Sequence, residues 1–167
     1  MSLNQTLLDE LEREANTTKK LLEKVSTEHL DWKPHEKSYK MGALAGHISE
    51  IPSWLDLMLN ADELDFATMN YTPPSIKENT DIMKLFEENL AKGKAVLENA
   101  TDEKFEGSWR MRHGEQIFFE LPRQQVIRTW VFSHIVHHRA QLGIYLRLLN
   151  IHVPSTYGPT ADEQQGM

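Results

Sequence analysis

The sequence predicts an all-α protein, an antiparallel four-helix bundle in a single domain that covers residues 1–167. Three observations lead to this fold class. Four long segments carry apolar residues at helical spacing, turn and breaker residues separate these segments, and only one short stretch alternates as strands do. A chain of this length is also large enough to bury the core that such a bundle requires.

The first two predicted helices occupy the N-terminal part of the chain. The first covers about residues 2–25, and Ser2 with Gln5 fits a capping box at its start. The second covers roughly residues 40–60. Pro52 lies inside this helix and should kink it, because proline removes a backbone N–H and clashes with the preceding turn.

The last two predicted helices flank the alternating stretch. The third covers about residues 79–99, and the fourth covers about residues 122–150 and begins with a proline that suits the first helical turn. Between them the sequence SWRMRHGEQIFFE, residues 108–120, alternates in polarity. We therefore predict a short hairpin there, with His113 and Gly114 in its turn.

Composition and charge exclude several classes of function. The formal net charge is −7 and the basic residues are scattered, so no basic stripe is available to bind nucleic acid. The chain has no cysteine, so any metal must be bound by His, Asp or Glu. No apolar run reaches the roughly 20 residues of a membrane span, and no apolar signal segment is found at the N-terminus. We expect a cytoplasmic protein with no membrane partner.

The fourth predicted helix carries three histidines within five positions, His134, His137 and His138. At 100° per residue, His134 lies at the centre of the inward stripe, and the other two flank it on opposite sides. Spacing i, i+4 lets His134 and His138 converge on one ion, but an i, i+3 pair can also chelate, so the spacing only favours this pair. Without an ion, the pair would be a polar patch or an interface cluster.

A third candidate ligand, His47, lies on the apolar face of the second predicted helix. By itself it would more often be a hydrogen-bonded core residue than a ligand. Three inward imidazoles without a shared partner, however, would leave unsatisfied polar groups at about 1–3 kcal/mol each. A divalent cation bound by their neutral nitrogens removes that difficulty and leaves a coordination position open.

Five further residues are candidates for the surroundings of this site. Gln141 could bond a ligand or be an ordinary solvated or core amide, and His137 could lie behind the ligands or at a helix interface. We expect Trp130 and Tyr145 to form bundle core and pocket wall. Glu50 could approach the site as a general base, although a solvated helix face is the simpler interpretation.

The fourth predicted helix is apolar on more than one face. Phe132, Ile135 and Leu146 point away from the histidine stripe, which suggests a second packed surface. We therefore predict a homodimer.

Several motifs resemble the DinB/YfiT-like superfamily over nearly the whole chain. They are HLDWKPHEKSYKMG, MGALAGHISEIPSWL, HIVHHRAQLGIYLRLLN and the tail VPSTYGPTADE, with H-x-x-x-H-R-x-Q-L as the most diagnostic part. The resemblance implies a four-helix bundle that binds a divalent metal, commonly nickel or zinc, through three histidines. Those ligands fall on His47, His134 and His138, which leaves His137 outside the set. It also implies that the tail packs on the bundle.

The resemblance implies a small-molecule metalloenzyme, either a metal-dependent hydrolase or an S-transferase or isomerase that uses a low-molecular-weight thiol such as bacillithiol or mycothiol. The absence of cysteine suits an external thiol, but it suits water equally well. The alternative is a non-catalytic binding or stress-response module with a structural or vestigial metal. The lack of an obvious general base favours this alternative, whereas three ligands rather than four argue against it.

Overall fold

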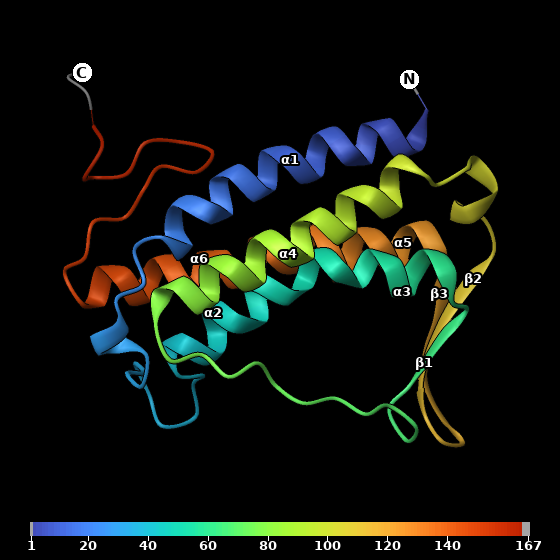
Figure 1. Cartoon of the computed structure of the whole chain (residues 1–167), viewed down its shortest axis with the longest axis horizontal. Coiled ribbons are helices and arrows are strands. Elements are labelled where there is room, and N and C mark those ends of the chain that lie inside the picture. Colours follow the sequence, from blue (N-terminus) through green and yellow to red (C-terminus); the bar gives the residue numbers. More distant parts are fainter. Residues whose placement is uncertain (1, 165–167) are drawn as a thin grey trace.

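Four helical units lie side by side and form the body of the protein, as the four periodic segments predict (Figure 1). The computed structural model describes residues 2–164. α1 packs on α4 and α6, and α2 packs on the same two helices, so the apolar core lies between these four. The helices are α1 (Leu3–Leu22), α2 (Met41–Glu50), α3 (Trp54–Asn60), α4 (Asn79–Glu98), α5 (Arg123–Ile127) and α6 (His134–Leu148).

The second helical unit is kinked at Pro52, as predicted. A 3-10 turn, Ile51–Ser53, joins α2 to α3, and the proline lies in its middle. α4 passes so close to this turn that a Cβ atom at Gly93 would overlap the carbonyl oxygen of Pro52. Glycine at this position therefore sets the distance between α4 and the kink.

Gly93→Ala should destabilise the protein by about 2 kcal/mol net, because the overlap with backbone exceeds the ~1 kcal/mol that alanine gains in helix propensity. Gly143→Ala is the matched control, since its Cβ would lie 3.6 Å from Leu21 Cδ2, an ordinary contact. Urea unfolding of both variants checks this prediction. Equal stability of the two variants would contradict it.

The fourth helical unit is not the single helix that the sequence predicts. α5 is followed by a π-helical segment, Arg128–Ser133, and α6 begins directly after it. Pro122 ends a strand and caps α5 instead of lying in the first helical turn. π-helical segments inside α-helices are often found at functional sites, and this one ends immediately before His134.

A three-stranded sheet makes the protein mostly helical rather than all-α. The predicted hairpin is present as β2 (Ser108–His113) and β3 (Gln116–Pro122), but its turn lies at 114–115, one residue later than predicted. β1 (Glu63–Asp65) was not predicted, and it pairs in parallel with β2. β1 was missed because three residues are too short to show strand alternation.

The capping box predicted at the start of the first helix is wrong. Ser2 is the N-cap residue, but its side chain makes no capping bond, and the Gln5 amide donates to Asp9 instead. A capping box is present at α4, where Glu78 and Asp81 bond each other's backbone N–H groups.

The second apolar face of the last helical unit is covered within the chain. Phe132, Ile135 and Leu146 are buried in the core, and α6, which carries the last two, packs against α1. This face therefore gives no support to a homodimer, which stays a prediction. Leu148 lies on the same side of the helix as His134 by helical spacing, but it is 56% exposed because it is the last residue of α6.

The C-terminal tail packs on the bundle, as the resemblance implies. Asp162 accepts two hydrogen bonds from Arg147 at 3.0 and 2.6 Å, and the Tyr157 ring lies against the Arg139 guanidinium. No helix in the described part of the chain is long and apolar enough to cross a membrane.

Candidate metal centre

Two helical units bring His47, His134 and His138 together. His47 is on α2, and the other two are on the first turns of α6. The Nε2 atom of His134 lies 3.0 Å from Nε2 of His47 and 3.1 Å from Nε2 of His138. One potential ligand atom of each residue lies within 4.8 Å of the other two, and among residues 2–164 no other group of His, Asp or Glu meets this criterion. The three side chains thus direct nitrogen atoms at one point.

The three imidazoles are electrostatically suited to bind a cation. Burial lowers the pKa of His47 and of His134 to about 4, with a further contribution from the neighbouring histidines, and burial also lowers the pKa of His138. The rings are therefore uncharged at neutral pH, and a metal binds only the uncharged ring. The donor set fits a divalent cation such as zinc or nickel.

Gln141 orients one of the candidate ligands. The Nδ1–H of His138 donates to Gln141 Oε1 at 2.8 Å, and this assignment leaves the Nε2 lone pair of His138 directed at the cluster. The Gln141 amide in turn lies 3.2 Å from His137 Nε2. His137 is exposed and outside the cluster, so the pair that converges has i, i+4 spacing. Residues that hold a ligand in this way commonly raise metal affinity.

Aromatic rings form the wall of the site. The ring centroids of Trp130 and His134 lie 5.7 Å apart. Phe119 stacks on Trp130, with ring centroids 5.6 Å apart. Trp54 contacts His47 and His134, with ring centroids 5.4 Å away in both cases. Only Trp130 was identified from the sequence. Trp54 lies seven residues after His47, two helical turns along the same face, and this spacing could have revealed it.

Two other sequence candidates lie at the edge of the site. Tyr145 is buried, packs on Trp32 and donates to the backbone carbonyl of Tyr39 at 3.1 Å, so it supports the segment before α2. Glu50 is half-buried and accepts a hydrogen bond from Tyr71 at 2.9 Å. Its carboxylate is not among the ligand atoms of the cluster. Burial raises the pKa of Glu50, so its helix face is not the fully solvated one expected.

Acidification should destabilise the metal-free protein. The pKa of His47 and His134 is about 4 when folded against 6.5 in an ordinary histidine, so the unfolded state takes up protons first as the pH falls. The contribution of the two uncharged histidines to the free energy of unfolding is complete above pH 6.5 and is lost as the pH falls towards 4. Between pH 7 and 5 we expect a loss of about 2 kcal/mol, because both rings are still partly solvated.

Urea unfolding of the metal-free protein at pH 7 and pH 5 measures this loss. The double variant His47→Gln/His134→Gln should show a much smaller loss over the same interval, because its glutamines do not titrate. An equal loss in the variant would contradict the assignment.

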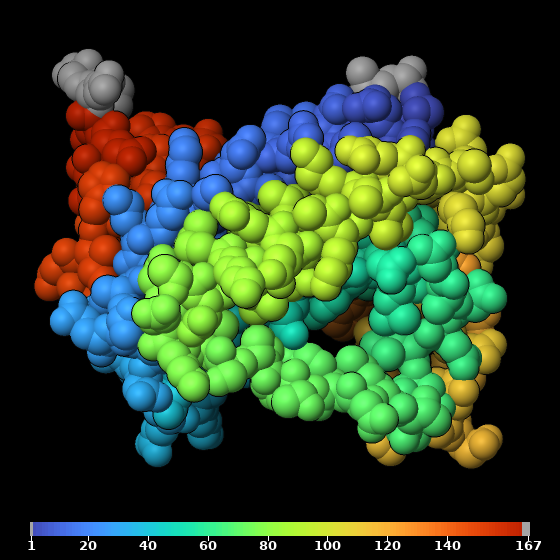
Figure 2. Space-filling model, in the orientation of Figure 1, coloured from blue at the N-terminus to red at the C-terminus, as the bar shows by residue number. Residues whose placement is uncertain are grey.

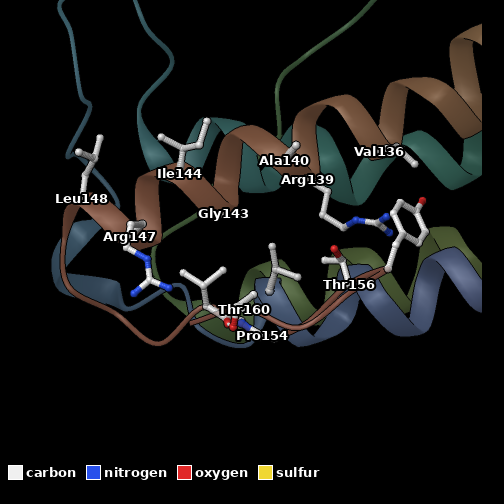
Figure 3. A pocket seen from close by; sticks show the side chains of 13 residues that line it. Val136, Arg139, Ala140, Gly143, Ile144, Arg147, Leu148, Pro154, Thr156 and Thr160 are labelled. Atoms are coloured by element: carbon white, nitrogen blue, oxygen red, sulfur yellow. The ribbon is translucent and has the colours of Figure 1, made fainter. Parts of the chain in front are cut away.

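A cavity of about 500 Å³ lies elsewhere, between α6 and the C-terminal tail (Figure 3). Its lining includes Val136, Ala140 and Gly143 on α6, and none of the three clustered histidines. Both arginines that line it are ion-paired, Arg139 with Glu14 at 2.7 Å and Arg147 with Asp162 at 2.6 Å. This cavity is separate from the candidate metal centre.

Comparison with known proteins agrees with the fold and the motifs. The model of the DinB family matches residues 1–167. A DinB-like protein from Bacillus subtilis is similar in structure, with a TM-score of 0.70 and 20% identity over 90% of this chain and 96% of that chain. A DinB-like protein from Bacillus cereus gives 0.64 and 21%, over 86% and 91%. No match was found among curated proteins. Because the family model covers the full length, the chain belongs to the DinB family.

Proposed function

We propose that the chain is a small-molecule metalloenzyme in which His47, His134 and His138 bind one divalent cation, zinc or nickel. The observation that carries this proposal is the convergence of three Nε2 atoms, two of them 3.0 and 3.1 Å from the third. Three protein ligands leave a position for a reactant, as in catalytic zinc sites, whereas structural sites usually have four. The bound cation would supply Lewis acidity and lower the pKa of a water or thiol that reaches it.

The residues around the cluster have distinct tasks in this proposal. Gln141 fixes the tautomer of His138 through the 2.8 Å hydrogen bond to Nδ1. Trp54 and Trp130 contact the ligand rings and limit the access of water to them. We assign no proton transfer to Glu50, because its carboxylate already accepts the hydrogen bond of Tyr71 at 2.9 Å.

The reaction is either hydrolysis or transfer to a low-molecular-weight thiol. Zinc-loaded protein, metal-free protein and the His134→Ala variant should be incubated with a panel of neutral esters and electrophiles. Each assay is run with water alone, with bacillithiol and with mycothiol. Turnover that needs zinc but no thiol supports a hydrolase, and turnover that needs both supports an S-transferase. Equal rates with and without metal would overturn the enzyme proposal.

The second candidate is a non-catalytic binding or stress-response module with a structural metal. One observation favours it: Glu50, the carboxylate nearest to His47 along α2, is already engaged by a hydrogen bond from Tyr71 at 2.9 Å. In that case removal of the metal should lower the unfolding temperature by several degrees, and the loaded protein should give no turnover with any reactant of the panel.

A further inference from the structure

Three side chains from three segments meet at the edge of the histidine cluster. Tyr39, just before α2, stacks on His47 with ring centroids 6.3 Å apart. Glu50 lies one turn after His47 on α2, and Tyr71 donates to its carboxylate at 2.9 Å. The two tyrosines are close enough to influence each other electrostatically. We call Tyr39, Glu50 and Tyr71 the mouth cluster.

Tyr71 reaches this place because a strap, residues 66–78, crosses the molecule from β1 to α4 (Figure 1). The strap has no regular secondary structure. It packs on α2 at Gly46, which has no side chain, so that Pro74 and Ile76 face the helix backbone there. A Cβ at Gly46 would lie 3.3 Å from Pro74 Cγ, so this contact is tight. Figure 2 shows a hollow between the green strap and the helices above it. Long irregular segments of this kind are often functional.

The carboxylate of Glu50 has no cationic partner. Within the described residues, no Lys, Arg or His nitrogen forms an ion pair with it, and its side-chain bond comes from the neutral Tyr71 hydroxyl. Several other carboxylates of the protein are paired, for example Glu120 with Arg110 at 2.8 Å. Burial raises the pKa of Glu50, and burial together with this hydrogen bond raises the pKa of Tyr71 to about 12. A half-buried carboxylate without a counter-ion is unfavourable unless a ligand supplies the charge.

The two tyrosines are unusually exposed for aromatic residues. Tyr39 is 60% exposed and Tyr71 is 51% exposed, although both lie beside a half-buried group. Aromatic faces next to a carboxylate are the chemistry that recognises an organic ammonium ion, through attraction to the ring quadrupoles and to the negative charge. An anionic group would be repelled at the same place.

We propose that the mouth cluster binds the ammonium group of a small organic cation. Tyr39 of this cluster stacks on His47, so a molecule held there extends towards the metal centre. The statement that such a molecule is the substrate rests on the proposed function, and it identifies the substrate class as a small molecule with an ammonium group. Binding of the cation itself does not depend on the metal.

Choline and its uncharged isostere 3,3-dimethylbutan-1-ol are suitable probes, because they differ in charge but not in shape. Calorimetric or NMR titrations at pH 8 and low salt should use metal-free and zinc-loaded wild-type protein. We expect choline to bind at least about tenfold more tightly than the alcohol in both forms. Equal binding of the two probes, or no binding of choline, would overturn the inference.

Three variants test whether choline binds to the mouth cluster or to the negative surface charge in general. Glu50→Gln and Tyr71→Leu should each weaken choline binding about tenfold. Tyr71 lies on an exposed strap, so its substitution should leave the bundle folded. Glu88→Gln removes an exposed carboxylate on α4 and should leave choline binding unchanged. An unchanged affinity in the first two variants would contradict the proposal. Zinc content of the same samples tests the metalloenzyme proposal separately.

Discussion

Replacing His134 by alanine should abolish stoichiometric binding of zinc or nickel. His134 is the central member of the cluster, since its Nε2 atom is the one that lies near Nε2 of both His47 and His138. Its loss leaves two nitrogen donors, too few for a mononuclear site. We expect the affinity to fall by a factor of at least about 10³, because metal ligands typically contribute several kcal/mol each.

His137→Ala is the matched control for this experiment. It removes an imidazole from the same helix, but His137 is exposed and lies outside the cluster. His137 contacts the Gln141 amide and the His138 ring but supplies no ligand atom, so we expect at most a tenfold loss of affinity. Metal analysis after dialysis against excess zinc, on protein purified without a nickel column, measures both variants. Stoichiometric zinc in His134→Ala would contradict the predicted ligand set.

The second large effect is expected at Arg139, the residue that follows His138. Its side chain is 2% exposed, and its guanidinium bonds the Glu14 carboxylate at 2.7 Å and Thr18 Oγ1 at 3.2 Å. Arg139→Met leaves the carboxylate of Glu14 in a mostly buried place without its counter-ion. We expect the free energy of unfolding to fall by about 3–5 kcal/mol, as is usual when one member of a buried ion pair is removed.

Arg147→Met is the comparison, because Arg147 pairs with Asp162 at 2.6 Å but is 47% exposed. Exposed pairs contribute about 1 kcal/mol or less. The double variant Glu14→Leu/Arg139→Met should recover part of the lost stability, since it leaves no unpaired charge. Urea unfolding of metal-free samples measures all three. A loss at Arg139 no greater than the loss at Arg147 would show that the pair does not hold α6 against α1.

Much of the fold could be predicted because it depends on local pattern. Helical periodicity identified all four helical units, and the proline inside the second unit placed its kink at Pro52. The hairpin was also predicted from its alternation. β1 could not be predicted, because its pairing with β2 joins residues more than forty positions apart and leaves no local pattern.

In the candidate site, too, the features that depend on local pattern could be predicted and the others could not. Periodicity placed His134 and His138 on one face, and His47 on the apolar face of another helix, so their meeting could be anticipated. The π-helical segment before His134 could not, because apolar spacing does not distinguish such a short segment from the α-helix around it. Tyr71 was missed because only the path of the strap brings it to Glu50.

The burial of Arg139 could not be predicted for a related reason. Helical spacing places Arg139 away from the histidines, but no local pattern indicates that α1 covers that side of α6. A helix enclosed on two faces buries residues that a single amphipathic stripe would leave in solvent.

X-ray absorption spectroscopy at the zinc edge, on fully loaded wild-type protein, tests the ligand set most directly. We predict about three imidazole nitrogens, with one or two oxygen donors from solvent, at roughly 2.0–2.1 Å from the metal. The scattering from the more distant ring atoms of the three imidazoles should drop in His47→Ala. A shell of oxygen donors without imidazole scattering would contradict the three-histidine centre formed by His47, His134 and His138.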